Sequence, residues 1–355
     1  ERDAMQQDDI RFSIEGHVGL IEIDRPKALN ALSYDMAVAL RQVLQGWAED
    51  DNVTHIVLAG SQPRAFCAGG DVRDLHAVAS RGEFDRMKVY FGAEYGAHLA
   101  VYEFPKPVIS LADGIVMGGG AGLMQCSTYM IVTEKSRFAM PESAIGLFPD
   151  AGASVFLGRC PRDIALLLGL TGRIIGAADC LMLGLAGAMV PSDSIDDLRA
   201  ALLACDVSEI DDVIGRFRAD PGMPPLQAHR ATISHVFAGD DLAAMRDRAG
   251  DLARLKGDAF AEDVHAALAT KCPASMHVFK RLLDMADRIG DIAAALRLDY
   301  RLAIRMTERP DFREGVRAVL IDKTHDAAWQ PARLEDVKPA VIDAIFDHQG
   351  LPSLS

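Results

Sequence analysis

The sequence predicts an α/β protein built around a largely parallel sheet, and two observations carry this prediction. First, short apolar runs at 54–59 (THIVLA), 108–111 (VISL) and 129–133 (YMIVT) have the length and composition of buried strands. Second, turns and stretches with helical spacing separate these runs, so strand, turn and helix repeat along the chain. With 355 residues, the chain can bury a large core in one domain or two.

The elements expected around these strands follow in order. Residues 10–23 alternate in part and contain Gly16, which predicts a β-hairpin. Residues 33–49 place apolar side chains at helical spacing, with Ser33 as the N-cap of the helix. Residues 83–103 also have a helical pattern, and Pro105 and Pro107 are expected to end this helix.

The pattern changes after residue 205. Residues 161–205 read as apolar helices, whereas 206–262 are acidic and are broken by the run PGMPPLQ. Beyond this the pattern is mostly helical, with helices expected over 274–289 and 292–307. We therefore expect a core over 10–205 that carries the functional site, an acidic connecting region over 206–262 and a C-terminal helical region over 263–355.

Composition limits the partners of the protein. The net charge of −14 argues against a nucleic-acid binder, which needs a basic face. No apolar run approaches the roughly 20 residues that span a bilayer, and the N-terminal ERDAMQQDD lacks the basic and apolar regions of a signal peptide. The six cysteines form no C-x-x-C pair and no His–Cys cluster, so neither a metal site nor a disulfide framework is indicated. The expected setting is reducing and cytoplasmic.

Two glycine turns occupy equivalent places, each after a strand and before a helix. They are AGGD at 68–71 and GGG at 118–120. A single triple glycine is more often a packing or turn feature, but two such turns can each direct one backbone N–H at the same oxygen. A developing oxyanion is the group that such a pair of donors stabilises.

Two carboxylates, Glu142 and Asp150, follow on a segment broken by Gly146 and Pro149. Carboxylates beside an oxyanion hole can transfer protons or act as nucleophiles on the same carbonyl. The alternative for Glu142 is a structural role at a helix N-terminus, and for Asp150 it is a helix cap. The combination with the glycine turns favours attack on an acyl group.

Four motifs in chain order resemble the enoyl-CoA hydratase/isomerase (crotonase) superfamily: HVGLIEIDRPKALNAL, AFCAGGD, GIVMGGGAGL and FAMPESAIGLFPDAG. Within it, the chain most resembles the 3-hydroxyisobutyryl-CoA hydrolases. FAMPESAIGLFPD is close to their catalytic stretch, and the segment DYRLAIRMTERPDFREGVRAVLIDKTHDAAWQP is similar to their helical tail. The resemblance implies the ClpP/crotonase spiral of ββα units with a C-terminal helical region. It is weakest over 206–255.

The resemblance also implies roles at matching positions. The backbone N–H groups of Gly70 and Gly119 would form the oxyanion hole for the thioester. Glu142 would attack the carbonyl to give a mixed anhydride, or act as the base for water. Asp150 would orient or deprotonate that water and protonate the leaving thiolate. Glu94 would accept a hydrogen bond from the substrate 3-hydroxyl, with a solvated helix face as its structural alternative.

The turn RPKALN matches the segment of the superfamily that contacts coenzyme A. Arg25, Lys27 and Ala28 are therefore candidate substrate-binding residues, with the two cations placed to meet phosphates. A solvated basic pair is the alternative. After FPDAG the chain reads ASVFLGR, which departs from the glycine-rich pattern of the hydrolases. The preference between 3-hydroxyisobutyryl, 3-hydroxypropionyl and other short acyl groups therefore stays open.

One absence bears on the reaction. A hydratase of this superfamily has a second glutamate two residues beyond the triple glycine, where this chain has Gly122. Hydrolysis, a step of valine catabolism, is therefore expected rather than hydration. Two alternatives are an isomerase or hydratase that uses Glu142 as its single base, and a non-catalytic acyl-CoA-binding or RNA-binding relative. Cys67, beside a glycine turn, is a weaker candidate nucleophile, because no histidine is placed to activate it.

The resemblance implies no metal or redox cofactor, since coenzyme A is part of the substrate. The expected partner is therefore a small acyl-CoA, with no nucleic acid and no membrane. Because crotonase relatives commonly form trimers or hexamers, the resemblance also allows a homo-oligomer.

Overall fold

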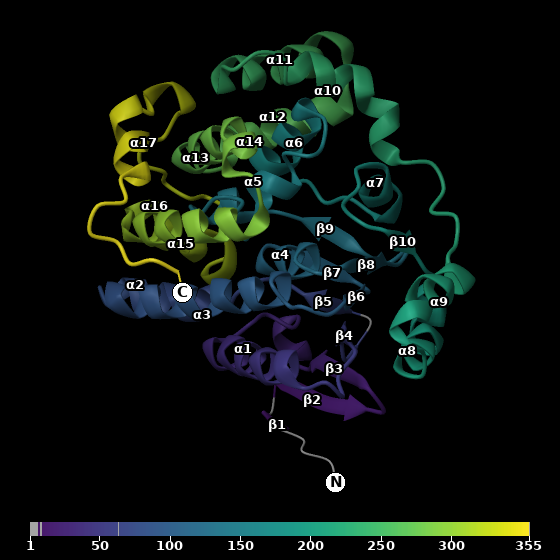
Figure 1. Cartoon of the computed structure of the whole chain (residues 1–355). Coiled ribbons are helices and arrows are strands. Elements are labelled where there is room, and N and C mark those ends of the chain that lie inside the picture. The colour runs from purple at the N-terminus through teal and green to yellow at the C-terminus, as the bar shows by residue number, and fades with distance from the viewer. Residues whose placement is uncertain (1–5, 8, 63, 355) are drawn as a thin grey trace. The chain divides into compact units, whose positions relative to one another are not determined.

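The computed structural model describes residues 6–7, 9–62 and 64–354 (Figure 1). The chain divides into two compact units. Each unit is assembled from three separate stretches of chain. Unit 1 takes Glu1–Asp71, Ala93–Phe138 and Ile175–Pro224, and unit 2 takes Val72–Gly92, Ala139–Ile174 and Pro225–Ser355.

Unit 1 is built on a seven-stranded sheet with the order β1-β2-β3-β4-β6-β8-β10. The first two pairs are antiparallel, and from β3 to β10 every neighbouring pair is parallel. The predicted parallel α/β sheet and the predicted N-terminal hairpin are thus confirmed. The strands are β1 (Gln6–Gln7), β2 (Ile10–Glu15), β3 (Val18–Ile23), β4 (His55–Gly60), β6 (Val108–Ala112), β8 (Tyr129–Val132) and β10 (Ala188–Met189).

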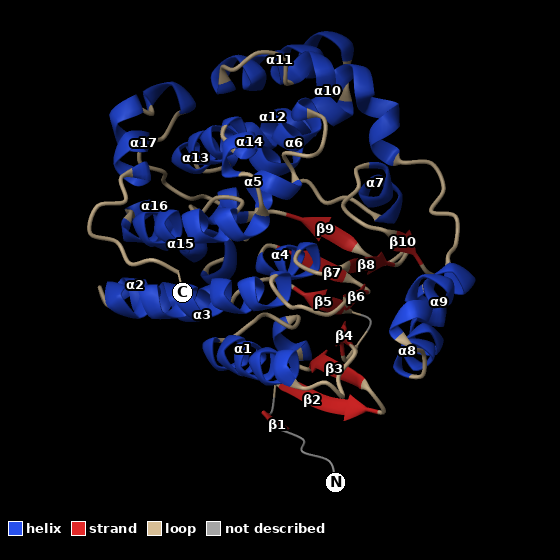
Figure 2. Cartoon of the chain, in the orientation of Figure 1, coloured by secondary structure: helices blue, strands red, loops and turns tan. Residues whose placement is uncertain are grey.

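A second, three-stranded sheet has the order β5-β7-β9 (Figure 2). It consists of β5 (Ala65–Cys67), β7 (Ile115–Met117) and β9 (Arg137–Ala139). Sequence patterning did not predict these strands, because three residues are too few to show an alternation of apolar and polar side chains. The parallel pairing of β5 with β7 is what places the two glycine turns.

The helices of unit 1 include the one expected near residue 40. Helix α1 (Tyr34–Glu49) begins where predicted, and its N-cap Ser33 accepts a hydrogen bond from the Met36 N–H at 3.3 Å. Apolar side chains of α8 (Ile195–Leu203) and α9 (Ile210–Phe217) form one buried cluster with side chains of the large sheet. The remaining helices are α4 (Gly119–Gln125), α7 (Ala177–Met182) and the C-terminal half of α3 (Phe84–Tyr102).

Unit 2 is helical (Figure 2). The expected helix over 274–289 is interrupted at Met285, and the one over 292–307 is confirmed as α15. The helices are α2 (Val72–Ser80), α5 (Ala153–Phe156), α6 (Arg162–Thr171), α10 (Arg230–Val236), α11 (Leu242–Lys256), α12 (Ala259–Thr270), α13 (Pro273–Asp284), α14 (Ala286–Ile289), α15 (Ile292–Glu308), α16 (Pro310–Val316) and α17 (Pro339–Phe346), with short 3₁₀ or π turns between them.

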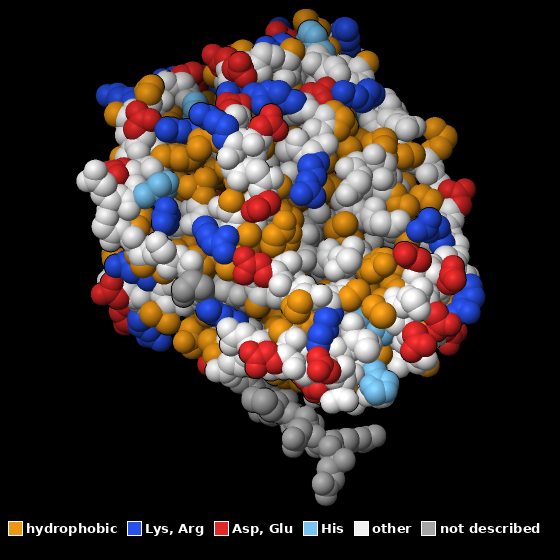
Figure 3. All heavy atoms as spheres, in the orientation of Figure 1, with side chains coloured by type: hydrophobic (Ala, Val, Ile, Leu, Met, Phe, Trp, Pro, Cys, Tyr) orange, Lys and Arg blue, Asp and Glu red, His pale blue; other side chains and the backbone are white. Residues whose placement is uncertain are grey.

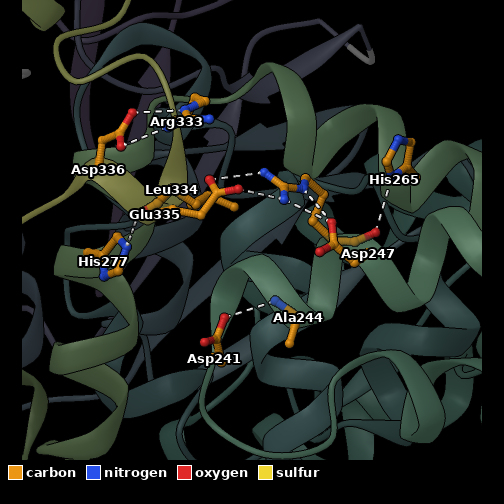
Figure 4. Close-up of polar contacts among 10 residues, drawn as sticks. Asp241, Ala244, Asp247, His265, His277, Arg333, Leu334, Glu335 and Asp336 are labelled. Atoms are coloured by element: carbon orange, nitrogen blue, oxygen red, sulfur yellow. Dashed lines mark hydrogen bonds and ion pairs between the residues drawn. The ribbon is translucent and has the colours of Figure 1, made fainter.

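Residues of the acidic segment 206–262 form specific polar contacts (Figure 4). Asp241 is the N-cap of α11 and accepts a hydrogen bond from the Ala244 N–H at 2.8 Å. On the same helix, a guanidinium nitrogen of Arg246 lies 2.8 Å from a carboxylate oxygen of Glu335. The acidic segment is thereby tied to the C-terminal part of unit 2.

Charged side chains of both signs are interspersed on the surface shown in Figure 3. Among the residues that the structure describes, no helix is long and apolar enough to cross a membrane.

Candidate active site

The two glycine turns meet in unit 1. Because β5 and β7 run parallel as neighbours, the turns that follow them leave the sheet at the same edge. A β-carbon added at Gly119 would lie 3.5 Å from the Gly70 nitrogen, and one added at Gly69 would lie 3.3 Å from the Gly119 nitrogen. The structure therefore brings together the two glycines that sequence analysis paired.

Glycine is required at these turns for backbone reasons. Gly118 is the N-cap of α4 with φ 53° and ψ −128°, and Gly69 has φ 105°, conformations that side-chain-bearing residues rarely adopt. A β-carbon at Gly120 would lie 2.0 Å from the Cys67 carbonyl oxygen. The turns can therefore approach each other and a substrate only without side chains.

Glu94 lies against both glycines from helix α3. Its side chain is buried, so the alternative of a solvated helix face is wrong. A β-carbon at Gly70 would lie 2.8 Å from each Glu94 carboxylate oxygen, and one at Gly119 would lie 2.5 Å from Oε1. The carboxylate is thus placed beside the backbone of the glycine pair.

His98, one helical turn beyond Glu94, is fully buried beside the same turn. Its Nδ1 lies 2.7 Å from the Glu94 carbonyl oxygen, and its Nε2 lies 2.6 Å from the Gly119 carbonyl oxygen. Burial lowers the pKa of His98, and the contacts with the Gly119 and Glu94 carbonyls oppose this effect. The imidazole thereby links α3 to the first residue of α4. Sequence analysis gave it no role, and its spacing from Glu94 was the only signal.

Replacing His98 with leucine should destabilise the protein by about 1–3 kcal/mol, since the link to the Gly119 carbonyl is lost from a buried position. Urea unfolding of wild type and variant measures the difference. The matched control is His17→Leu, because the His17 imidazole makes its hydrogen-bond contact in an exposed position. Equal unfolding midpoints for wild type and the His98 variant would contradict the proposed link.

The RPKALN turn lies next to the AGGD turn. Arg25 precedes a short 3₁₀ turn (Pro26–Ala28), and its guanidinium contacts an Asp71 carboxylate oxygen at 2.7 Å. Arg25 is thus paired with a carboxylate of the glycine turn. A phosphate group would have to compete with Asp71 for this guanidinium. Lys27 is exposed and Ala28 is half-buried.

Glu142 and Asp150 lie on one short segment of unit 2. Glu142 is the first residue of a 3₁₀ turn (Glu142–Ile145) that ends at Gly146 with φ 73°, and its side chain is buried. Asp150 is also buried and precedes helix α5. The N-cap residue of α5 is Gly152, two residues beyond Asp150.

A third carboxylate of unit 2 was missed in sequence analysis. Asp299 on α15 is fully buried, and its Oδ2 accepts a hydrogen bond from the Gly152 N–H at 2.9 Å. Burial raises the pKa of Asp299 well above its usual range, the Gly152 hydrogen bond lowers it, and the charge of Asp150 raises it further. One signal could have found it: Asp299 is an acidic residue within the apolar stripe formed by Leu296 and Leu302.

Cys67 is unsuited to act as a nucleophile. Its side chain is completely buried, and burial raises the pKa of the thiol to about 12. The thiolate that a nucleophile needs is therefore scarce at neutral pH.

A family profile described as enoyl-CoA hydratase/isomerase matches residues 18–346. The chain is 36% identical over 344 residues to the mitochondrial 3-hydroxyisobutyryl-CoA hydrolase of Xenopus tropicalis, covering 94% of this chain and 88% of that protein. It is 33% identical to 3-hydroxyisobutyryl-CoA hydrolase 1 of Arabidopsis thaliana, covering 96% and 92%.

Two solved structures share the fold over nearly the whole chain, which confirms the expected crotonase-like architecture. A carnitinyl-CoA dehydratase from Mycobacterium thermoresistibile aligns with a TM-score of 0.90 and 31% identity, covering 98% of this chain and 99% of that one. An enoyl-CoA hydratase from Rhodobacter sphaeroides 2.4.1 aligns with a TM-score of 0.86 and 33% identity, with the same coverage.

Proposed function

This chain belongs to the enoyl-CoA hydratase/isomerase family, and on that premise we propose that it hydrolyses the thioester of a short 3-hydroxyacyl-CoA. The preferred substrate is 3-hydroxyisobutyryl-CoA, which yields 3-hydroxyisobutyrate and free coenzyme A, a step of valine catabolism. Near full-length similarity to several 3-hydroxyisobutyryl-CoA hydrolases is the observation that carries the proposal. A panel of short acyl-CoAs assayed for free thiol tests it, with the highest kcat/KM expected for 3-hydroxyisobutyryl-CoA.

In the proposed reaction the thioester oxygen accepts hydrogen bonds from the N–H groups of Gly70 and Gly119. Their proximity supports this role, because donors that are already in place need little reorganisation as charge develops. Glu94 would accept a hydrogen bond from the 3-hydroxyl, and its buried position against both glycines supports that assignment.

In the proposed reaction, Glu142 and Asp150 of unit 2 break the thioester bond and transfer the protons. Glu142 attacks the carbonyl carbon and expels the thiolate, or it removes a proton from the attacking water. In the first route, water then cleaves the mixed anhydride and Asp150 takes its proton. That proton, passed to the thiolate, completes the formation of CoA-SH. A carboxylate is a weak nucleophile, so the oxyanion hole must supply much of the rate enhancement. This chemistry requires no metal and no redox cofactor.

Hydration or dehydration of an enoyl-CoA is the second candidate, because the two solved relatives carry those names. Against it, Gly122 lies in α4 where the hydratase pattern has a second glutamate. Crotonyl-CoA separates the candidates: a hydratase removes the absorbance of the conjugated double bond, whereas a hydrolase releases free thiol. Loss of absorbance at a rate above thiol release would favour the hydratase.

We propose Arg25, Lys27 and Ala28 as contacts for coenzyme A, and a homo-oligomer that sedimentation can measure. We also propose a reducing, cytoplasmic compartment, supported by six cysteines that are all free thiols. Several relatives are named mitochondrial, so the mitochondrial matrix is the alternative. Localisation of the tagged chain in its source cell distinguishes the two.

Alanine at position 119 keeps the backbone N–H, but its β-carbon should displace that donor, so kcat should fall by up to about 10²–10³-fold, the usual cost of losing one oxyanion donor. The added β-carbon would lie 2.5 Å from Glu94 Oε1 and would force the carboxylate or the turn to move. Gly46→Ala is the matched control, since its β-carbon meets nothing within 4 Å. Thiol release measures both variants, and an unchanged kcat for the Gly119 variant would remove this residue from the oxyanion hole.

A further inference from the structure

Asp299 occupies an unusual position for a carboxyl group. It lies on the buried face of α15 between Leu296 and Leu302, and none of the three is exposed to solvent. In the described part of the chain, Asp150 is the charged group that shifts the pKa of Asp299, and no cation contributes to that shift. An isolated ionised carboxylate in such surroundings is strongly disfavoured relative to water.

The two oxygens of Asp299 differ in their surroundings. Oδ2 accepts the Gly152 N–H at 2.9 Å. Oδ1 is buried and has no hydrogen-bond partner in the described part of the chain. The negative charge of Asp150 also disfavours ionisation of Asp299. One accepted hydrogen bond, no cation and a neighbouring negative charge together favour the neutral carboxylic acid.

The hydrogen bond reaches a strained turn. Ala151 and Gly152, which directly follow Asp150, have φ values of 50° and 87°. The left-handed conformation is unfavourable for an alanine, so the surrounding structure must hold it. Asp299 supplies one such restraint through the Gly152 N–H, and Ile292 on the same helix packs against the turn, 3.1 Å from where a Gly152 β-carbon would lie. Helix α15 therefore contacts the turn that follows Asp150 at two points, through Asp299 and Ile292.

We propose that Asp299 is a positioning residue for Asp150 and that it acts as a neutral carboxylic acid. Its carboxyl group holds the turn 150–152 through the Gly152 N–H, and this aims the Asp150 carboxylate. Being neutral, it fulfils this role without a second negative charge beside Asp150. The proposal rests on the catalytic role proposed for Asp150.

Two substitutions separate the hydrogen bond from the charge. Asp299→Asn keeps the size and the acceptor oxygen of a neutral acid, so kcat should stay within about twofold of wild type, a change small beside the tenfold steps of catalytic effects. Asp299→Leu removes the acceptor, and kcat should fall about 10²-fold with KM little changed, as expected when a catalytic group is misplaced. The matched control is Asp291→Asn, at the exposed N-cap of the same helix.

Infrared spectroscopy gives a readout that does not depend on activity. The difference spectrum of wild type minus Asp299→Asn at neutral pH should contain the C=O stretch of a protonated carboxylic acid. Absence of that band, or a loss of kcat in the asparagine variant equal to that in the leucine variant, would overturn the neutral acid. An unchanged kcat in the leucine variant would overturn the positioning role. If the leucine variant does not fold, the asparagine variant and the spectrum still decide the neutral acid, and Asp299→Ala, which also lacks the acceptor, takes the place of the leucine variant in the test of the positioning role.

These outcomes are distinct from failure of the proposed function. A wild-type protein that releases no thiol from any 3-hydroxyacyl-CoA would refute the hydrolase, yet it would leave the infrared band unaffected. A wild-type hydrolase whose difference spectrum lacks the band would refute the neutral Asp299 alone.

Discussion

Glu142→Gln is expected to lower kcat for thiol release by about 10⁴-fold, whether Glu142 is the nucleophile or the base. Glutamine has nearly the same shape but cannot share an electron pair with the carbonyl carbon or accept a proton from water. Because glutamine fills nearly the same buried volume at the start of the 3₁₀ turn, the substitution should leave the backbone in place. The dissociation constant of a non-hydrolysable acyl-CoA analogue should therefore change little.

Glu262→Gln, on an exposed position of α12, is the matched control and should retain full activity. Thiol release and calorimetric titration of the analogue measure catalysis and binding separately. Normal turnover by the Glu142 variant would refute both proposed roles of this residue. Loss of analogue binding together with turnover would instead indicate that Glu142 binds substrate.

Asp150→Asn is expected to lower kcat by about 10²–10⁴-fold, the range for loss of a general acid–base group. Its effect distinguishes the two roles left open for Glu142. If Glu142 is the nucleophile, the variant forms the mixed anhydride and then hydrolyses it slowly, so intact-mass spectrometry should detect the protein plus the acyl group. If Glu142 is the base, no acylated protein should accumulate.

Asp287→Asn, an exposed position on α14, is the matched control for the Asp150 variant. A single turnover with a stoichiometric amount of substrate gives the clearest signal, because any acyl-enzyme then persists. Unchanged kcat in Asp150→Asn would exclude this carboxylate from proton transfer. It would also remove the basis for the positioning role of Asp299.

Much of the fold was predictable because its periodic elements are long. The hairpin over 10–23, helix α1 with its Ser33 cap and helix α15 all lie where their patterns place them. The strands of the second sheet were not predictable, since three residues carry no measurable period. The acidic stretch 206–262 also gave no functional indication, although Asp241 within it caps a helix.

The candidate site divides along similar lines. Gly70, Gly119, Glu142 and Asp150 were named from motifs, because glycine turns and local carboxylate spacing are properties of consecutive residues. His98 was given no functional role, and Asp299 was not named. Asp299 lies 147 residues from the Gly152 N–H that it accepts, and no local pattern encodes a contact across such a separation.

The sequence by itself determined the α/β class, the two glycine turns and the carboxylates that favour hydrolysis over hydration. Each of these features is recognisable from a short stretch of consecutive residues. Only the tertiary structure decided that Gly70 and Gly119 lie side by side, that Glu94 is buried against them and that Asp299 holds the turn after Asp150. The physical reason is that burial and hydrogen bonding between distant segments depend on how strands pair and helices pack. Strand pairing and helix packing bring together residues that are far apart in the sequence, and the sequence pattern does not reveal these contacts.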